Sequence, residues 1–98
     1  MEFQFTTIPY DRTTFLNGTL QTAPKSSAVY RIFDTRNTLI VLDRTSNLQQ
    51  RLERYFGHRS ERLRDLDLRE ITGRIEFLRT ASPFETTYLL YQIGRAHV

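Results

Sequence analysis

The side chains with the clearest chemical potential in this chain are its arginines. Thirteen of the fourteen basic residues are arginine, and six of them lie between Arg44 and Arg64, a segment whose carboxylates are Glu53 and Glu61. A guanidinium presents a planar fork of donors that matches a phosphate group, so this segment is a candidate surface for a nucleic-acid backbone. The alternative is a solvated face in an arginine-rich proteome, and charge alone favours that alternative.

Cysteine and histidine chemistry has no support in the sequence. The chain contains no cysteine, which excludes disulfides, zinc–cysteine sites and thiol catalysis. His58 is the one histidine outside the last six residues. A loop histidine beside an arginine is more often a surface residue than a base, so nothing favours a Ser-His-Asp site.

The composition is that of one small globular domain. The chain has 98 residues, of which 39% are hydrophobic and 12% aromatic, and this balance is typical of a compact fold. The longest apolar runs are too short to cross a bilayer, and the N-terminus lacks the basic region and hydrophobic core of a signal peptide. We therefore expect a cytoplasmic protein.

A predicted β-hairpin at residues 28–43 is the central element. The runs A-V-Y-R-I-F and T-L-I-V-L-D are rich in β-branched and aromatic residues, and they flank the turn D-T-R-N. If Phe33 pairs with Thr38 across this turn, the antiparallel register places Tyr30 opposite Val41.

A helix at about residues 46–56 is predicted to follow this hairpin. Ser46 is a suitable N-cap, Gln49 stands where a capping box needs it, and Gly57 ends the helix. The apolar residues expected to face the core recur at helical spacing and are Leu48, Leu52, Tyr55 and Phe56.

The remaining patterns predict an α+β fold. Phe3 and Phe5 alternate with polar residues, which indicates an N-terminal strand, and Asp11 begins a short helical stretch that Gly18 weakens. The expected antiparallel sheet contains the hairpin at about 28–43, a strand at about 74–80 and the N-terminal strand at 2–8. The helices expected to flank it lie at about 46–56, 61–71 and 82–92.

The last of these helices has the clearest start. Ser82 is the N-cap, Pro83 occupies the first helical position, and Glu85 is the third helical residue of a capping box. This position alone accounts for Glu85 as a structural residue.

Taken together, these segments resemble the GIY-YIG nuclease superfamily, most closely the N-terminal domain of the UvrC excinuclease subunit. In that family a G-[IV]-Y strand leads to a Y-[IV]-G strand, a basic residue, a helix with an inward arginine and a terminal aromatic pair. Here A-V-Y ends at Tyr30, V-L-D ends at Asp43, and Arg44 is the basic residue. N-L-x-x-R-L supplies Arg51, and Tyr55 begins the aromatic pair.

The resemblance divides the chain into three parts. It covers about residues 24–92 and leaves 1–23 as an N-terminal extension. The final residues 93–98, I-G-R-A-H-V, place a glycine in an apolar helix and match the translation of a common sequencing-adapter sequence. We interpret them as an artefact at a truncated gene end and expect the natural chain to continue past Gln92.

The resemblance implies a Mg²⁺-dependent (or Mn²⁺-dependent) endonuclease that cleaves DNA in repair, with other excision-repair proteins as partners. Tyr30 would position or deprotonate the attacking water, Arg51 would hold the scissile phosphate, and Glu85 would bind the metal. The residues implied to contact DNA are Arg44, Arg51, Arg54 and Tyr55.

Each of these roles has a structural alternative. Tyr30 is equally an aromatic strand residue, Arg51 a solvent-facing helix residue, and Glu85 a helix cap. Arg44 lies just ahead of a helix N-terminus, where free amide donors favour an anion, or it is simply a turn residue. We expect Tyr30, Arg51 and Glu85 to converge on one concave patch if the site exists.

The second motif departs from the family. Neither motif glycine is present, and Val41 replaces a tyrosine. Loss of a proton-transfer group typically lowers a rate by about 10²- to 10⁴-fold. Asp43 brings a negative charge that could repel DNA or serve as a second metal ligand. The alternative function is therefore a catalytically decayed GIY-YIG fold that binds DNA or a partner protein.

Overall fold

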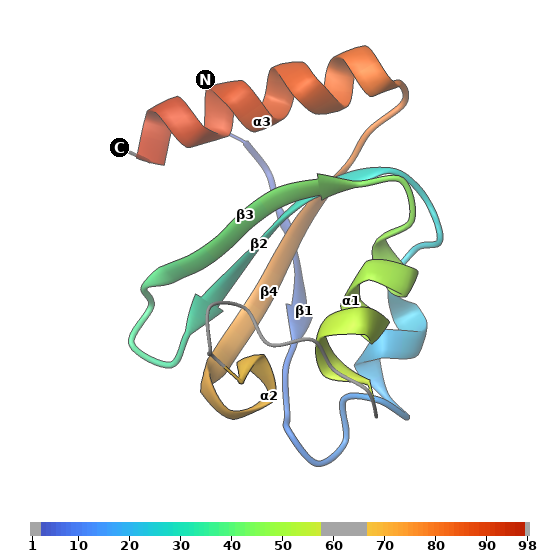
Figure 1. The fold of residues 1–98 in the computed structure, drawn as a ribbon, viewed down its shortest axis with the longest axis vertical. Coiled ribbons are helices and arrows are strands. Elements are labelled where there is room, and N and C mark those ends of the chain that lie inside the picture. Colours follow the sequence, from blue (N-terminus) through green and yellow to red (C-terminus); the bar gives the residue numbers. More distant parts are fainter. Residues whose placement is uncertain (1–2, 58–66, 98) are drawn as a thin grey trace.

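The computed structural model describes residues 3–57 and 67–97 and has an α+β architecture, as predicted (Figure 1). Its one sheet has four antiparallel strands in the order β1-β4-β2-β3. The strands are β1 (Thr6–Pro9), β2 (Ala28–Asp34), β3 (Leu39–Thr45) and β4 (Thr72–Arg79). The described helices are the 3-10 helix η1 (Thr19–Thr22), α1 (Leu48–Phe56), α2 (Leu68–Ile71) and α3 (Pro83–His97).

Most predicted elements are present with shifted ends. The N-terminal strand begins at Thr6, where pairing with Phe77 of β4 starts, rather than at residue 2. α3 runs through Gly94 to His97 and is longer than the predicted 82–92. Of the predicted helix 61–71, residues 68–71 form α2, and residues 61–66 lie outside the described residues.

The short helix expected after Asp11 is replaced by turns that end in η1. The Asp11 carboxylate accepts hydrogen bonds from the backbone N–H and the hydroxyl of Thr13, at 2.9 and 2.8 Å. These local bonds satisfy the backbone without a helix, in a segment whose threonines and Gly18 have low helix propensity.

The hairpin register differs from the prediction by two residues. Tyr30 pairs with Asp43, and Val41 pairs with Ile32 instead of Tyr30. Phe33 pairs with Leu39, so the connection takes five residues rather than four. An irregularity between Ile32 and Phe33 adds the second residue of the shift.

The turn itself explains the longer connection. The Asp34 carboxylate accepts hydrogen bonds from the N–H groups of Arg36 and Thr38, at 2.8 and 2.9 Å. Asn37 adopts a φ of 67°, a left-handed conformation that asparagine tolerates better than most residues. Together they form a wide Asx-type turn, which is closed by a hydrogen bond from the N–H of Asp34 to the carbonyl of Thr38 at 2.9 Å.

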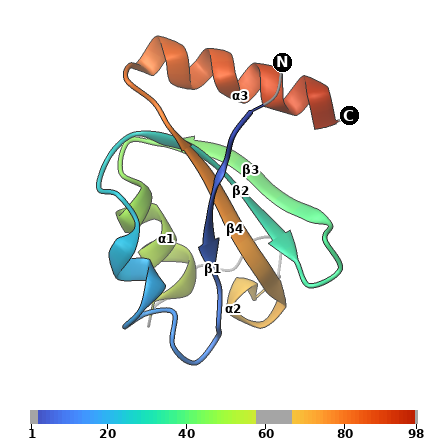
Figure 2. The ribbon, with the colours of Figure 1, turned by 180° about the vertical axis from the view of Figure 1, so that it is seen from behind.

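α3 runs across the top of the sheet, and α1 lies beside the sheet below α3 (Figures 1 and 2). The two helices contact strand side chains of opposite faces, because side chains alternate along each strand. Ala28, Tyr30 and Ile32 point to the face that packs on α1 and belong to the same buried cluster as its leucines. Arg44, which pairs with Val29, points to the other face and donates a hydrogen bond to Thr87 of α3.

The N-terminal segment contributes to the same core as the hairpin. Ile8, Phe15 and Leu20 belong to the buried cluster that contains Tyr30 and Phe56. Tilted or edge-on ring contacts at centroid distances of 5.0 to 5.1 Å join Tyr10, Phe15 and Phe56. Tyr10, Phe15 and Leu20 therefore pack against α1, whereas β1 pairs with β4 at the edge of the sheet.

The α3-side face of the sheet carries a charged cluster outside the core. Glu76 accepts from Arg31 at 2.6 Å and from Arg74 at 3.1 Å. Burial alone would raise the pKa of Glu76, but the two guanidinium groups outweigh it and hold that pKa below its usual value.

Among residues 3–57 and 67–97, no helix has both the length and the apolar character needed to cross a membrane.

Candidate functional site

Three of the predicted site residues meet between β2 and α1. The hydroxyls of Tyr30 and Tyr55 lie 3.0 Å apart, and Arg51 Nη1 donates to the Tyr30 hydroxyl at 3.3 Å. Arg51 and Tyr55 share one side of α1 because they are four residues apart. We call these three residues the Tyr–Tyr–Arg cluster.

The packing of α1 positions this cluster. Leu48 and Leu52 are fully buried, which fixes the rotation of the helix on the sheet. The N-cap is Asn47, whose side chain accepts from the N–H of Gln50 at 3.0 Å, and not Ser46 as predicted. The cap lies one residue later because the strand β3 continues to Thr45.

The start of α1 does not offer free amides to an anion. The N–H of Leu48 donates to the carbonyl of Ser26, and that of Gln49 donates to the carbonyl of Pro24, both at 3.1 Å. With the Gln50 amide taken by Asn47, the predicted anion site at this helix start is wrong. Loop 24–27, which the sequence did not connect with α1, supplies these acceptors.

Burial determines what the cluster can do chemically. Tyr30 is 0% exposed, and its burial, followed by its hydrogen bond with Tyr55, raises its pKa above the ordinary value. Tyr30 is therefore a neutral phenol at physiological pH. Burial lowers the pKa of Arg51, but the neighbouring tyrosine hydroxyls outweigh it and raise that pKa overall. The Arg51 side chain is 28% exposed, so its cation is the part of the cluster that a ligand can reach.

Burial of Tyr30 is expected to make the fold less stable at alkaline pH. The unfolded chain loses the tyrosine proton near pH 10, whereas folded Tyr30 keeps it, so stability is fully present below pH 10 and falls above it. In Tyr30→Phe we expect this loss to be smaller by about 1.4 kcal/mol for each pH unit above about 10. Urea unfolding between about pH 8 and pH 11 measures the effect. An unfolding free energy that falls equally with pH in wild type and Tyr30→Phe would contradict it.

Asp43 lies at the rim of the cluster. It pairs with Tyr30 across the hairpin, and its Oδ2 lies 3.8 Å from Arg51 Nη1. Its side chain is 50% exposed, so the ion pair is screened by solvent and weak. The carboxylate nevertheless occupies the approach to Arg51, where it would compete with a phosphate. Val41 is buried opposite Ile32 and brings no hydroxyl.

The other predicted residues lie apart from the cluster. Arg44 is on the opposite face of the sheet, and its hydrogen bond to Thr87 joins it to α3. Glu85 Oε1 accepts from the N–H of Ala81 at 3.2 Å, and the N–H of Glu85 donates to Ser82 Oγ at 3.1 Å. The predicted cap at Ser82 is thus confirmed. Arg54 is exposed in the last turn of α1.

Glu85 and the cluster lie toward the same end of the sheet. Arg79 at the end of β4 pairs with Ala28, and the N–H of Thr80 donates to the carbonyl of Ser27 at 3.0 Å. α3 therefore begins beside the start of β2, two residues from Tyr30. The hydrogen bonds that Glu85 makes within the described residues stay at the start of α3, so its capping role is the one the geometry displays. Of the three residues expected to converge, Tyr30 and Arg51 are in contact, and within the described residues no hydrogen bond or ion pair joins Glu85 to either.

A single carboxylate is compatible with Mg²⁺, which keeps several of its waters and takes few protein ligands. The Ala81 amide occupies Glu85 Oε1, so Oε2 would be the oxygen available to a metal. Within residues 3–57 and 67–97, no three Asp, Glu or His side chains gather as a metal site.

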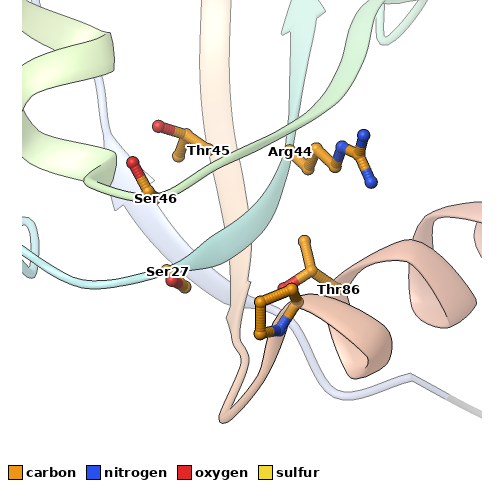
Figure 3. A pocket seen from close by; sticks show the side chains of 6 residues that line it. Ser27, Arg44, Thr45, Ser46 and Thr86 are labelled. Carbon is orange, nitrogen blue, oxygen red and sulfur yellow. The ribbon is translucent and has the colours of Figure 1, made fainter.

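A cavity of about 270 Å³ lies between the end of β3 and the start of α3. Ser46 is on its α1 side, and Arg44 and Thr86 are on its α3 side (Figure 3). The residues that line it are mostly hydroxylic and are Ser27, Arg44, Thr45, Ser46, Pro83 and Thr86. Sequence reasoning missed these hydroxyls because they come from three separate segments without a shared motif.

Comparisons with protein-family models, with curated proteins and with solved structures found no match to this chain. The fold and the site define an α+β domain in which a hairpin and the following helix bring two tyrosines and an arginine together.

Proposed function

We propose that this chain is a UvrC-like GIY-YIG endonuclease domain that cleaves a DNA phosphodiester with one bound Mg²⁺ or Mn²⁺. Its rate is expected to be low because of the residues at positions 41 and 43. The observation that supports the proposal best is the Tyr–Tyr–Arg cluster, in which Tyr30 contacts two residues of α1 that are 21 and 25 positions away in the sequence. These contacts join three of the motif positions of the resemblance, and Glu85 is not among them.

The order of elements supports the same proposal. The hairpin β2–β3 leads into α1, a further strand pairs on the free side of β2, and a capped helix follows. The resemblance requires this sequence of hairpin, helix and late carboxylate-bearing helix. It is also the source of a further proposal, that excision-repair proteins are partners. The proposal that the protein acts in the cytoplasm comes instead from the short apolar runs of the sequence.

The residues take roles that follow from their environments. Arg51 is expected to hold the scissile phosphate through its planar donors and to stabilise the charge that develops there. Tyr30 is expected to orient Arg51 rather than to act as a base. A buried phenol with a raised pKa forms little of the phenolate that could take up a proton. A metal at Glu85 would supply Lewis-acid stabilisation of the phosphate and the leaving oxygen.

Nicking of supercoiled plasmid DNA tests the proposal. We expect wild-type protein to nick the plasmid in Mg²⁺ but not in EDTA, and Glu85→Gln to lose at least about 100-fold in rate. Glutamine keeps an oxygen that can accept the Ala81 hydrogen bond, so this substitution removes the charge with little effect on the cap. Glu85→Ala removes both the negative charge and the hydrogen bond to Ala81.

Arg36→Ala is the matched control for nonspecific charge effects, since Arg36 is exposed in the hairpin turn. Nicking that persists undiminished in both Glu85 variants would contradict the proposal that this domain is an endonuclease. Complete absence of nicking by the wild-type protein would contradict it as well.

The second candidate is a catalytically decayed GIY-YIG fold that binds DNA or a partner protein. The ion pair of Asp43 with Arg51 favours it, because the carboxylate partly neutralises the cation meant for phosphate. This candidate predicts DNA binding that needs neither Mg²⁺ nor Glu85, together with no nicking.

A further inference from the structure

The outer side of α3 carries an unusual row of exposed aromatic side chains. Phe84, Tyr88 and Tyr91 are 81%, 47% and 60% exposed. Their spacing of four and three residues places them along one side of the helix, and we call them the aromatic stripe. The rings of Phe84 and Tyr88 are nearly parallel, with an interplanar angle of 12° and centroids 6.5 Å apart. Contiguous exposed apolar side chains of this kind generally mark an interaction site.

A cation from the sheet is held at this stripe. Thr87 lies on the same side of the helix, three residues after Phe84 and four before Tyr91. Arg44 Nη1 donates a hydrogen bond to the Thr87 hydroxyl, which carries the guanidinium from β3 to the edge of the stripe. The surface thus combines flat aromatic faces with a fixed positive charge.

We propose that the aromatic stripe and Arg44 bind an unpaired DNA strand. Bases would stack on the rings, and Arg44 would contact a backbone phosphate. This proposal rests on the proposed function, because it names single-stranded DNA as the part of the substrate that α3 binds, on the opposite face of the sheet from the Tyr–Tyr–Arg cluster. Base stacking on aromatic side chains is tolerant of sequence, and a positively charged groove usually accompanies it.

A cavity on the sheet-facing side of α3 lies next to the stripe. Arg44 connects the two regions, because it lines the cavity and also donates to Thr87, whereas the buried Thr86 lines only the cavity (Figure 3). The Ser46 hydroxyl on its other side can donate a hydrogen bond to a phosphate oxygen, whereas the Thr45 hydroxyl already donates to the carbonyl of Asn47. A strand that leaves the stripe would meet Arg44 and the Ser46 hydroxyl at this cavity, and such donors suit a phosphate backbone better than an apolar protein segment.

Fluorescence anisotropy with a labelled oligo(dT) and a matched duplex, both in EDTA, tests the proposal. We expect the single strand to bind more tightly than the duplex, and the double variant Phe84→Leu, Tyr88→Leu to bind it about 10- to 100-fold more weakly. Leucine keeps an apolar surface and removes the aromatic face, while Phe84→Tyr keeps the ring and is expected to bind like the wild type. Arg44→Ala should reduce the slope of log affinity against log salt by about 0.7.

The outcomes separate this proposal from the nuclease. Oligo(dT) binding that the double leucine variant leaves unchanged would overturn the stripe proposal, even if plasmid nicking is observed. Stripe-dependent binding of oligo(dT) without any nicking would support the stripe and contradict only the enzyme. Sedimentation velocity tests whether the aromatic stripe instead binds a second copy of the chain. Self-association that the leucine substitutions abolish, with oligo(dT) binding intact, would also overturn the proposal.

Discussion

Replacing Arg51 with alanine is expected to lower the rate of Mg²⁺-dependent plasmid nicking by about 10²- to 10³-fold. Arg51 Nη1 is held 3.3 Å from the Tyr30 hydroxyl, so its donors are oriented before a phosphate arrives. Such preorganised donors stabilise developing charge without reorganisation during the reaction. Arg51→Lys keeps the charge but loses the planar fork, and we expect an intermediate rate.

Asp43→Asn is the matched substitution that is expected to strengthen, rather than weaken, the contact of Arg51 with DNA. The carboxylate oxygen lies 3.8 Å from Arg51, and replacing it with an amide frees the guanidinium without changing the shape of the strand. We expect this variant to bind DNA more tightly and to nick at least as fast as the wild type. Rates for Arg51→Ala and the wild type that agree within error, in proteins with equal circular dichroism, would contradict the assigned role of Arg51.

Replacing Phe56 with alanine is expected to lower the free energy of unfolding by about 3–5 kcal/mol. Phe56 is 1% exposed, and its ring contacts those of Tyr10 and Phe15 at 5.1 Å each. The cavity left behind would separate α1 from the N-terminal segment. Since small domains have only about 5–15 kcal/mol in total, much of the native state would be lost. Urea unfolding followed by circular dichroism measures the change.

Phe84→Ala is the control for this substitution, because Phe84 is 81% exposed. We expect it to change the unfolding free energy by less than about 0.5 kcal/mol. If Phe56→Ala is as harmless as Phe84→Ala, the N-terminal segment does not share a core with α1.

The helix and the hairpin were predictable because their signals are local. Leu48, Leu52, Tyr55 and Phe56 recur at helical spacing, and all four are buried where the pattern places them. Tyr30, Arg51 and Tyr55 come together because one helix follows directly after one hairpin. The motif spacing therefore contained the geometry of the cluster.

The hairpin register was not predictable from strand patterns alone. It depends on the side chain of Asp34, which widens the turn, and on the left-handed conformation of Asn37. A shift of two residues leaves every side chain on its original face, so the alternation of apolar and polar residues cannot discriminate between the two registers. The consequence is chemical, since Asp43 and not Val41 lies opposite Tyr30.

The positions of Arg44 and Glu85 depended on long-range packing. Because side chains alternate along β3, Arg44 points away from the neighbouring Asp43 side chain and toward α3. Where α3 crosses the sheet is set by tertiary contacts that no local pattern encodes. The exposed aromatic stripe was hidden for the same reason, because the helical spacing of Phe84, Tyr88 and Tyr91 does not reveal whether that side of the helix faces the sheet or solvent.

The most direct test of the central claim is an NMR titration of arginine side chains with a short DNA in Ca²⁺, which supports binding but is a poor substitute for Mg²⁺ in catalysis. The Nε–Hε signal of Arg51 is expected to shift as DNA is added, while that of Arg31, which already donates to Glu76, stays in place. An unchanged Arg51 signal, with shifts confined to other arginines, would contradict the claim that the Tyr–Tyr–Arg cluster is a phosphodiester site.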